Sequence, residues 1–292
     1  MRTALIAVGL FSLVANEAAW GQTSYVGSIG TLPIELALDS YSGGEVEGVY
    51  IYKKFGSPIA LTGTTTQGTL VLTEGNVHGK ATARLTIPAF TADLQTITGT
   101  WQNLATGQQL PVVLTPQFER DLNQDSDSTA HPELLQVSAL KTCYFKVVLS
   151  SSESIGSVKL YEKRTSRLVQ ELKADCELRG IQSVSVGDFN FDGLEDFAVY
   201  QQGFAGPNTA SLYFLYDPIK KKYVDSGFEG VSLQFDAKTK RVYETNSCCA
   251  GSSVQNSVYK IVRNRMVLVE QHCLRWNEKK QALVERKLSE CQ

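Results

Sequence analysis

The chain has 292 residues, of which 42% are hydrophobic and 20% charged, and its formal net charge is −2. A balance this close to neutrality gives no electrostatic reason to expect nucleic acid or an anionic membrane as a partner. The length suffices for one large β domain or for two modest domains that each have a core.

Residues 1–21 have the features of a secretory signal peptide. Arg2 gives a positive start, and residues 4–15 form an apolar run that is too short to span a bilayer. The small residues Ala19 and Gly21 then have the spacing that cleavage requires. No cysteine lies at the cleavage point, which argues against a lipid anchor there. We therefore expect an exported protein.

Residues 22–120 show repeated strand periodicity. In LPIELALD, residues 32–39, apolar side chains recur at every second position. The same pattern predicts strands at 32–39, 47–54, 57–63, 68–74, 81–88, 94–101 and 110–116. Turn residues separate them at intervals of about ten residues, which is typical of an antiparallel meander, sandwich or barrel. We expect an N-terminal β domain here.

Residues 121–135 are polar and read as a linker. Asp121, Asn123, Asp125 and Asp127 sit at every second position. No glycine turns this chain around an ion, so a solvated linker is favoured over a metal site.

Residues 136–292 are again rich in strand patterns. Predicted strands lie at 143–150, 156–163, 167–173, 181–186, 196–200, 211–217, 230–236, 240–245, 257–262, 265–274 and 282–288. No long stretch has helical periodicity. The sequence therefore predicts an all-β protein of two antiparallel, sandwich-like or barrel-like β domains with few or no helices.

All the cysteines lie in the second half of the chain. They are Cys143, Cys176, Cys248, Cys249, Cys273 and Cys291. An even number in an exported chain indicates disulfides, and no CxxC pair supports a zinc site instead. Adjacent cysteines in extended backbone point to opposite faces. We expect bonds from Cys143 to Cys176 and from Cys248 or Cys249 to Cys273.

The segment DFNFDGLED, residues 188–196, has the pattern of a calcium loop. The predicted ligands are Asp188, Asn190, Asp192, the carbonyl of Leu194, and Asp196. Gly193 permits the sharp bend that brings these oxygens together, and hard oxygen donors favour Ca²⁺. The glutamate that closes a helix–loop–helix site is absent, because Val199 occupies its position, and the flanking segments read as strands. The alternative is an acidic turn without an ion.

A glycine-rich loop follows the strand after this acidic segment. It consists of Gly203, Phe204, Ala205, Gly206, Pro207, Asn208, Thr209 and Ala210. We interpret it as a protruding recognition loop that the ion holds at its base, the alternative being an ordinary hairpin loop. The small-residue segment 247–256 is a second candidate.

The sequence contains no motif for catalysis. The histidines are His78, His131 and His272, and none lies in a known motif. Glu162, Glu171 and Asp175 are better read as exposed strand carboxylates than as an acid–base pair. The chain therefore reads as a binding protein, not an enzyme, with a calcium-containing hydrolase as the remaining alternative.

Four features together resemble a known family. They are the export signal, SGGEVEGVYIYKKFGSPIALTG at 42–63, VGDFNFDGLEDFAV at 186–199, and GFAGPNTA at 203–210. The chain resembles the calcium-binding periplasmic immunity proteins of bacterial-killing type IV secretion systems, first described in Xanthomonas. Its second domain is similar to the periplasmic inhibitors of invertebrate-type lysozyme.

This resemblance implies a periplasmic protein that blocks a lysozyme-like, peptidoglycan-cleaving effector by placing the loop 203–210 in its cleft. The family's calcium ligands map onto the five predicted above. The family's loop usually presents polar and tyrosine groups, where this chain has Phe204 and Pro207. The implied partner is the effector protein, bound by a monomer or weak dimer without a membrane anchor once the signal is removed. The alternative is a calcium-dependent envelope module that binds glycan, cell wall or protein without inhibition.

Overall fold

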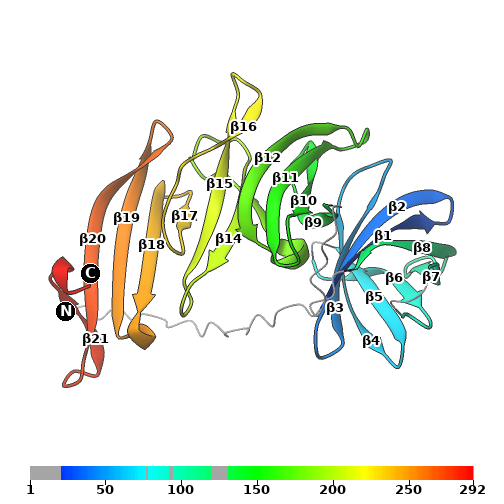
Figure 1. Ribbon diagram of the computed structural model, residues 1–292, viewed down its shortest axis with the longest axis horizontal. Helices are drawn as coiled ribbons and strands as arrows, with labels where there is room; N and C mark the ends of the chain where they lie inside the picture. The colour runs from blue at the N-terminus through cyan, green and yellow to red at the C-terminus, as the bar shows by residue number, and fades with distance from the viewer. Residues whose placement is uncertain (1–20, 77, 92–94, 120–130, 292) are drawn as a thin grey trace.

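A computed structural model describes residues 21–76, 78–91, 95–119 and 131–291. Within these residues the regular elements are β-strands and three short 3₁₀ helices, which confirms the all-β fold. Figure 1 shows a barrel at one end of the molecule and a row of sheets that continues from it. The predicted signal peptide, apart from its last residue, and the acidic stretch at 121–127 lie outside the described residues. No helix in the described part of the chain has the length and apolar character that a membrane crossing requires.

The first eight strands form a closed antiparallel barrel. They are β1 Gly21–Ile29, β2 Leu32–Ser40, β3 Glu45–Tyr52, β4 Ile59–Thr66, β5 Thr69–Gly75, β6 Ala81–Ile87, β7 Ile97–Asn103 and β8 Gln109–Glu119. Each strand pairs with the next, and β1 pairs with β8 to close the ring. Side chains such as Leu36, Leu70 and Leu114 fill the interior. The alternation in the sequence thus separates the inner face from the outer face.

The sequence periodicity missed β1, because its buried residues do not alternate. Gln22, Tyr25 and Ile29 are buried, at spacings of three and four residues. The register between β1 and β8 shifts between Ser24 and Tyr25. The extra residue of this bulge is Gln117 of β8, so β1 itself keeps its alternation. Tyr25 and Ile29 belong to the barrel core, whereas Gln22 is on the other face, opposite Asp39, whose carboxylate accepts from the N–H of Ile181. Because both faces of β1 are covered, a period of two does not describe its burial.

The second half of the chain forms three antiparallel sheets. The first contains β9 Glu133–Ala139, β10 Cys143–Leu149, β11 Ser154–Glu162 and β12 Leu168–Glu177. The second contains β13 Val184–Gly187, β14 Asp196–Gly203, β15 Thr209–Asp217 and β16 Lys222–Asp225. The third contains β17 Gln234–Asp236, β18 Arg241–Cys248, β19 Ser253–Val262, β20 Arg265–Asn277 and β21 Ala282–Arg286. The 3₁₀ helices are η1 Gly180–Gln182, η2 Cys249–Gly251 and η3 Leu288–Glu290.

The second sheet is the middle layer of this stack, with apolar contacts on both faces. Phe197 and Val199 of β14 belong to the core shared with the first sheet. Ala198, between them in the sequence, belongs to a core that includes Ile261 and Met266 of the third sheet. A strand buried on both faces needs an uninterrupted apolar run, which explains the sequence FAVY.

The barrel packs directly on the first sheet. Ala37, Val49 and Ile51 of the barrel lie in the same core as the first and second sheets. Lys146 of β10 lies 2.6 Å from a carboxylate oxygen of Glu35 in β2. These apolar and ionic contacts join the two halves of the chain.

Candidate functional site

The acidic segment forms the connection between β13 and β14, so its predicted flanking strands are confirmed. Its side chains accept hydrogen bonds from its own backbone. The carboxylate of Asp188 accepts from the N–H groups of Asp192 at 3.0 Å and Gly193 at 2.8 Å. Asp192 in turn accepts from the N–H of Leu194 at 2.8 Å. Gly193 has φ +87°, a conformation that glycine adopts without steric cost.

Asp196 closes the loop from inside the protein, where its side chain is 0% exposed. One oxygen accepts from the N–H of Phe189 at 2.9 Å, and the other accepts from the N–H of Tyr216 at 2.8 Å. Burial raises the pKa of Asp196 to about 6, opposed by these two donors and reinforced by the charges of Asp192 and Asp188. A buried carboxylate with two acidic neighbours is stabilised by any cation placed among them.

The loop also contacts both neighbouring sheets. The main-chain N–H of Lys141, between β9 and β10, donates to Glu195 at 2.9 Å. Asn190 donates to the side chain of Asn264, between β19 and β20, at 3.1 Å. The ring of Phe189 packs on Phe235, with 4.9 Å between ring centroids. The segment therefore connects all three layers at this end of the stack.

The donor chemistry of the loop suits Ca²⁺, since it offers carboxylates, an amide oxygen and a main-chain carbonyl. Across the described residues, however, no group of three or more His, Cys, Asp or Glu side chains is arranged to hold a metal. The carboxylates of Asp188 and Asp192 bond to backbone N–H groups of the loop. Calcium binding by Asp188, Asn190, Asp192, Leu194 and Asp196 stays a prediction.

The glycine-rich loop connects β14 to β15. Its residues 203–207 are exposed, and Phe204 is 44% exposed. Three contacts fix its ends. The N–H of Phe204 donates to the carbonyl of Asn208 at 2.9 Å. Glu177 of β12 accepts from the N–H of Gly203 at 3.2 Å, and Thr209 accepts from the N–H of Ser232 at 2.7 Å.

The acidic loop does not lie at the base of the glycine-rich loop, so that expectation was wrong. The acidic loop enters β14 at Asp196, and the glycine-rich loop leaves it at Gly203. A strand of this length separates its two ends by about 23 Å. Because both loops are connections of one antiparallel sheet, they lie at opposite ends of the middle layer, as the course of β14 in Figure 1 shows.

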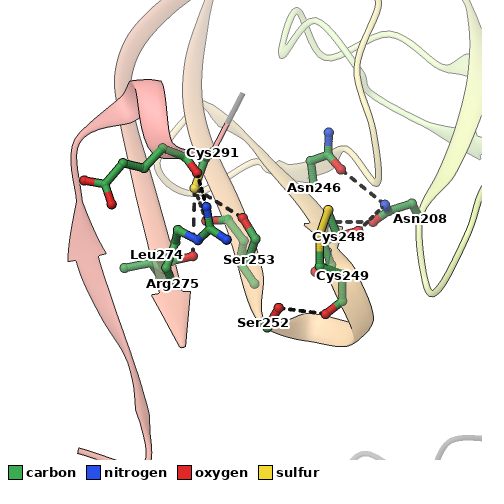
Figure 2. The surroundings of a disulfide bond; sticks show 12 residues. Asn208, Asn246, Cys248, Cys249, Ser252, Ser253, Leu274, Arg275 and Cys291 are labelled. Atoms are coloured by element: carbon green, nitrogen blue, oxygen red, sulfur yellow. Dashed lines mark hydrogen bonds between the residues drawn. A yellow bond between two sulfur atoms is a disulfide. The ribbon is translucent and has the colours of Figure 1, made fainter. Parts of the chain in front are cut away.

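The disulfide pairing differs from both expected bonds. Cys248 bonds to its neighbour Cys249, and Cys273 bonds to Cys291. The side chains of Cys248 and Cys249 do not point to opposite faces as expected, because Cys249 has φ +58° and ends the extended strand. Figure 2 shows the Cys248–Cys249 bond in the turn that follows β18.

Cys143 and Cys176 are free and buried. On the shared strand β11, Cys143 pairs with Glu162 and Cys176 pairs with Ile155. Those positions are seven residues apart, which separates the two thiols by about 23 Å along the sheet. The tertiary register therefore excludes a bond between them.

The structure brings the two candidate recognition segments together through Asn208, which is 7% exposed. Its side-chain oxygen accepts from the N–H of Ser247 at 3.0 Å. Its amide donates to the carbonyl of Ser247 at 2.7 Å and to Asn246 at 3.2 Å. Figure 2 shows this side chain directed at the disulfide turn. Asn208 is therefore a positioning residue, and no pattern in the sequence indicated that it would join two sheets.

The groups considered for acid–base chemistry do not converge. His131 contacts the carbonyl of Leu149 at 3.3 Å. The ring nitrogens of His272 lie 2.7 Å from Glu270 and 2.8 Å from Glu285 on the exposed third sheet, and these carboxylates raise the His272 pKa. On the first sheet, Glu162 bonds to Thr165 and Glu171 bonds to Ser157. The two loops that flank β14 are therefore the candidate functional segments.

Comparison with known proteins gives neither a matching family model nor a matching curated protein. Among solved structures, the chain is similar to a Xanthomonas type IV secretion system related protein, with a TM-score of 0.28 and 12% identity over 91% of this chain and 99% of that one. It is also similar to a Kuenenia stuttgartiensis hydrazine synthase, with a TM-score of 0.29 and 8% identity over 87% of this chain and 92% of that one. Similarities of this size carry no argument about function.

Proposed function

We propose that this protein is a periplasmic inhibitor, or immunity protein, that blocks a lysozyme-like peptidoglycan-cleaving enzyme. The observation that carries the proposal is the loop 203–208, whose tip is exposed while its base is fixed to all three sheets of the stack. A loop already ordered before binding loses little conformational entropy when it enters a cleft. The resemblance described from the sequence supplies the class of partner.

The chemistry of the loop is compatible with such a cleft. Residues 203–208 contain no charged side chain. Glycosidases place two carboxyl groups beside the scissile bond. An uncharged loop can enter between them without like-charge repulsion, whereas an acidic loop would be repelled. Phe204 supplies an exposed apolar surface for the sugar-binding part of the cleft.

In this proposal a calcium ion has a structural role. Asp188, Asn190, Asp192, the carbonyl of Leu194, and Asp196 would hold it. The ion would supply positive charge to a segment that contacts the first and third sheets. It would therefore stabilise the stack from which the loop 203–208 extends, without touching the partner.

The proposal is tested by binding and inhibition. Calorimetry of the mature chain with a panel of purified muramidases, including an invertebrate-type lysozyme, should detect a 1:1 complex. The muramidase that binds should then clear cell-wall suspensions more slowly when the chain is added. Phe204→Ala should weaken binding at least tenfold. Ile219→Ala is the matched control, because Ile219 is 92% exposed on the turn between β15 and β16, at the other end of the sheet. Lack of binding to every enzyme in the panel would refute the proposal.

A second candidate is an envelope module that binds glycan directly. The exposed ring of Phe204 favours it, because sugars stack on aromatic rings. Sedimentation with isolated peptidoglycan separates the two functions. The module would sediment with the polymer and leave muramidase activity unchanged, whereas the inhibitor would stay in solution and bind the enzyme.

A further inference from the structure

The Cys248–Cys249 turn and the glycine-rich loop are held as a single unit. Both polar ends of the Asn208 side chain bond to residues 246 and 247, immediately before the disulfide. Because Asn208 is nearly fully buried, these bonds are protected from competition by water. A displacement of one segment must therefore displace the other.

The turn itself is held in a costly backbone conformation. Cys249 has φ +58° and Ala250 has φ +53°, and neither is a glycine. Left-handed backbone is disfavoured for such residues, because their Cβ atoms approach the neighbouring main chain. Ser252 opposes this cost, since its N–H and hydroxyl donate to the carbonyl of Cys249 at 3.1 and 2.8 Å. These contacts define the shape of the turn.

The exposed surface of the turn matches that of the loop in chemistry. Cys248, Cys249 and Ala250 are exposed, as are residues 203–207. Neither the loop nor residues 246–253 contain a charged side chain. The polarisable sulfur atoms and the ring of Phe204 are suited to apolar and aromatic contacts. Carbohydrate-binding clefts are lined with aromatic and neutral polar groups, which are the complement of such a surface.

We propose that the disulfide turn at residues 247–252 is the second half of the partner-binding surface. In this arrangement the loop 203–208 enters the cleft of a glycan-cleaving enzyme, while the turn packs against the rim of that cleft. The inference rests on the proposed function and deepens it, because it assigns enzyme recognition to two sheets of the stack instead of one hairpin.

The test measures affinity by calorimetry for whichever muramidase of the panel binds the wild-type chain. Cys248→Ser with Cys249→Ser should weaken binding at least tenfold. Cys273→Ser with Cys291→Ser makes the same chemical change at a bond between a buried and a half-buried cysteine, and should change affinity less than threefold at a temperature where this variant remains folded. Circular dichroism establishes that each variant is folded.

A second variant covers the case in which loss of the disulfide unfolds the turn. Ala250→Lys leaves both cysteines in place and puts a charge on the exposed surface, so it should also weaken binding about tenfold. Wild-type affinity in both turn variants, with weakened binding in Phe204→Ala, would overturn this inference and leave the proposed function standing. Failure of the wild-type chain to bind any muramidase would overturn both.

Discussion

The two ends of β14 are stabilised by different chemistry. At the first end, the carboxylates of Asp188, Asp192 and Asp196 accept hydrogen bonds within one charged loop. At the other end, the neutral amide of Asn208 connects two hairpins from different sheets. The comparison indicates that the acidic loop joins the three sheets through polar and charged groups, whereas the opposite end joins its sheets around a neutral amide and leaves residues 203–207 exposed. An ion bound at the acidic loop would lie about 23 Å along the sheet from a partner bound at residues 203–207.

The largest effect is expected from Asp196→Ala. It removes the acceptor for two N–H groups, those of Phe189 and Tyr216, and should lower the free energy of unfolding by about 2–4 kcal/mol. Urea unfolding measures this. Glu229→Ala, at an exposed position, should change stability by less than about 0.5 kcal/mol. Equal stability of both variants would show that the carboxylate is not essential to the acidic end.

The corresponding change at the other end is Asn208→Ala. Loss of its bonds to Asn246 and Ser247 should lower the free energy of unfolding by about 2 kcal/mol. Hydrogen exchange should accelerate in residues 203–208 and 246–252 but not in 188–195. Exchange that accelerates equally in all three segments would contradict the independence of the two ends.

Calcium should act on the acidic end alone. If the dissociation constant is about 0.1 mM, 1 mM Ca²⁺ raises the free energy of unfolding by about 1.4 kcal/mol. Asp192→Ala should abolish this increase and make melting insensitive to chelator. Asp217→Ala is the control, because Asp217 also accepts two turn N–H groups, from Ile219 and Lys220, but lies outside the loop. Identical melting of the wild-type chain with and without chelator would argue against a bound ion.

The smallest effect is a pH dependence that arises from Asp196. Its folded-state pKa of about 6 exceeds the usual value of 3.8, so the folded state binds the proton more tightly than the unfolded state. The stabilisation that this proton binding provides is complete below pH 3.8 and is lost as the pH rises through 6. Between pH 5 and 7 the free energy of unfolding should therefore fall by about 1 kcal/mol. With chelator present, the free energy of unfolding should fall by about 1 kcal/mol more between pH 5 and 7 in the wild-type chain than in Asp196→Asn. A parallel pH profile for the two proteins would contradict the assignment.

The acidic loop was the part of the site that could be read from sequence. The bonds within the loop join residues two to seven positions apart, such as Asp188 with Gly193 and Asp196 with Phe189. Local spacing therefore specifies them, as it specifies the strands on either side. The spacing predicts an ion in this loop, and the chelator experiment tests that prediction.

Strand prediction failed where burial departs from simple alternation. β1 is buried on both faces at different positions, and β9 buries the polar residue Gln136. The amide of Gln136 donates to the carbonyl of Gly180 at 3.2 Å, and its oxygen accepts from the N–H of Ser183 at 2.9 Å. A buried polar side chain becomes acceptable only when distant partners satisfy it, and those partners are not visible in a local window.

By itself, the sequence determined the all-β fold, the acidic loop and the glycine-rich loop, because each depends on residues close together in the chain. Only the tertiary structure decided that the loops occupy opposite ends of β14, that Cys248 bonds to Cys249, and that Asn208 joins the glycine-rich loop to the disulfide turn. The contact between Asn208 and Ser247 spans 39 residues. It exists because apolar burial on both faces of the middle sheet places the third sheet beside it.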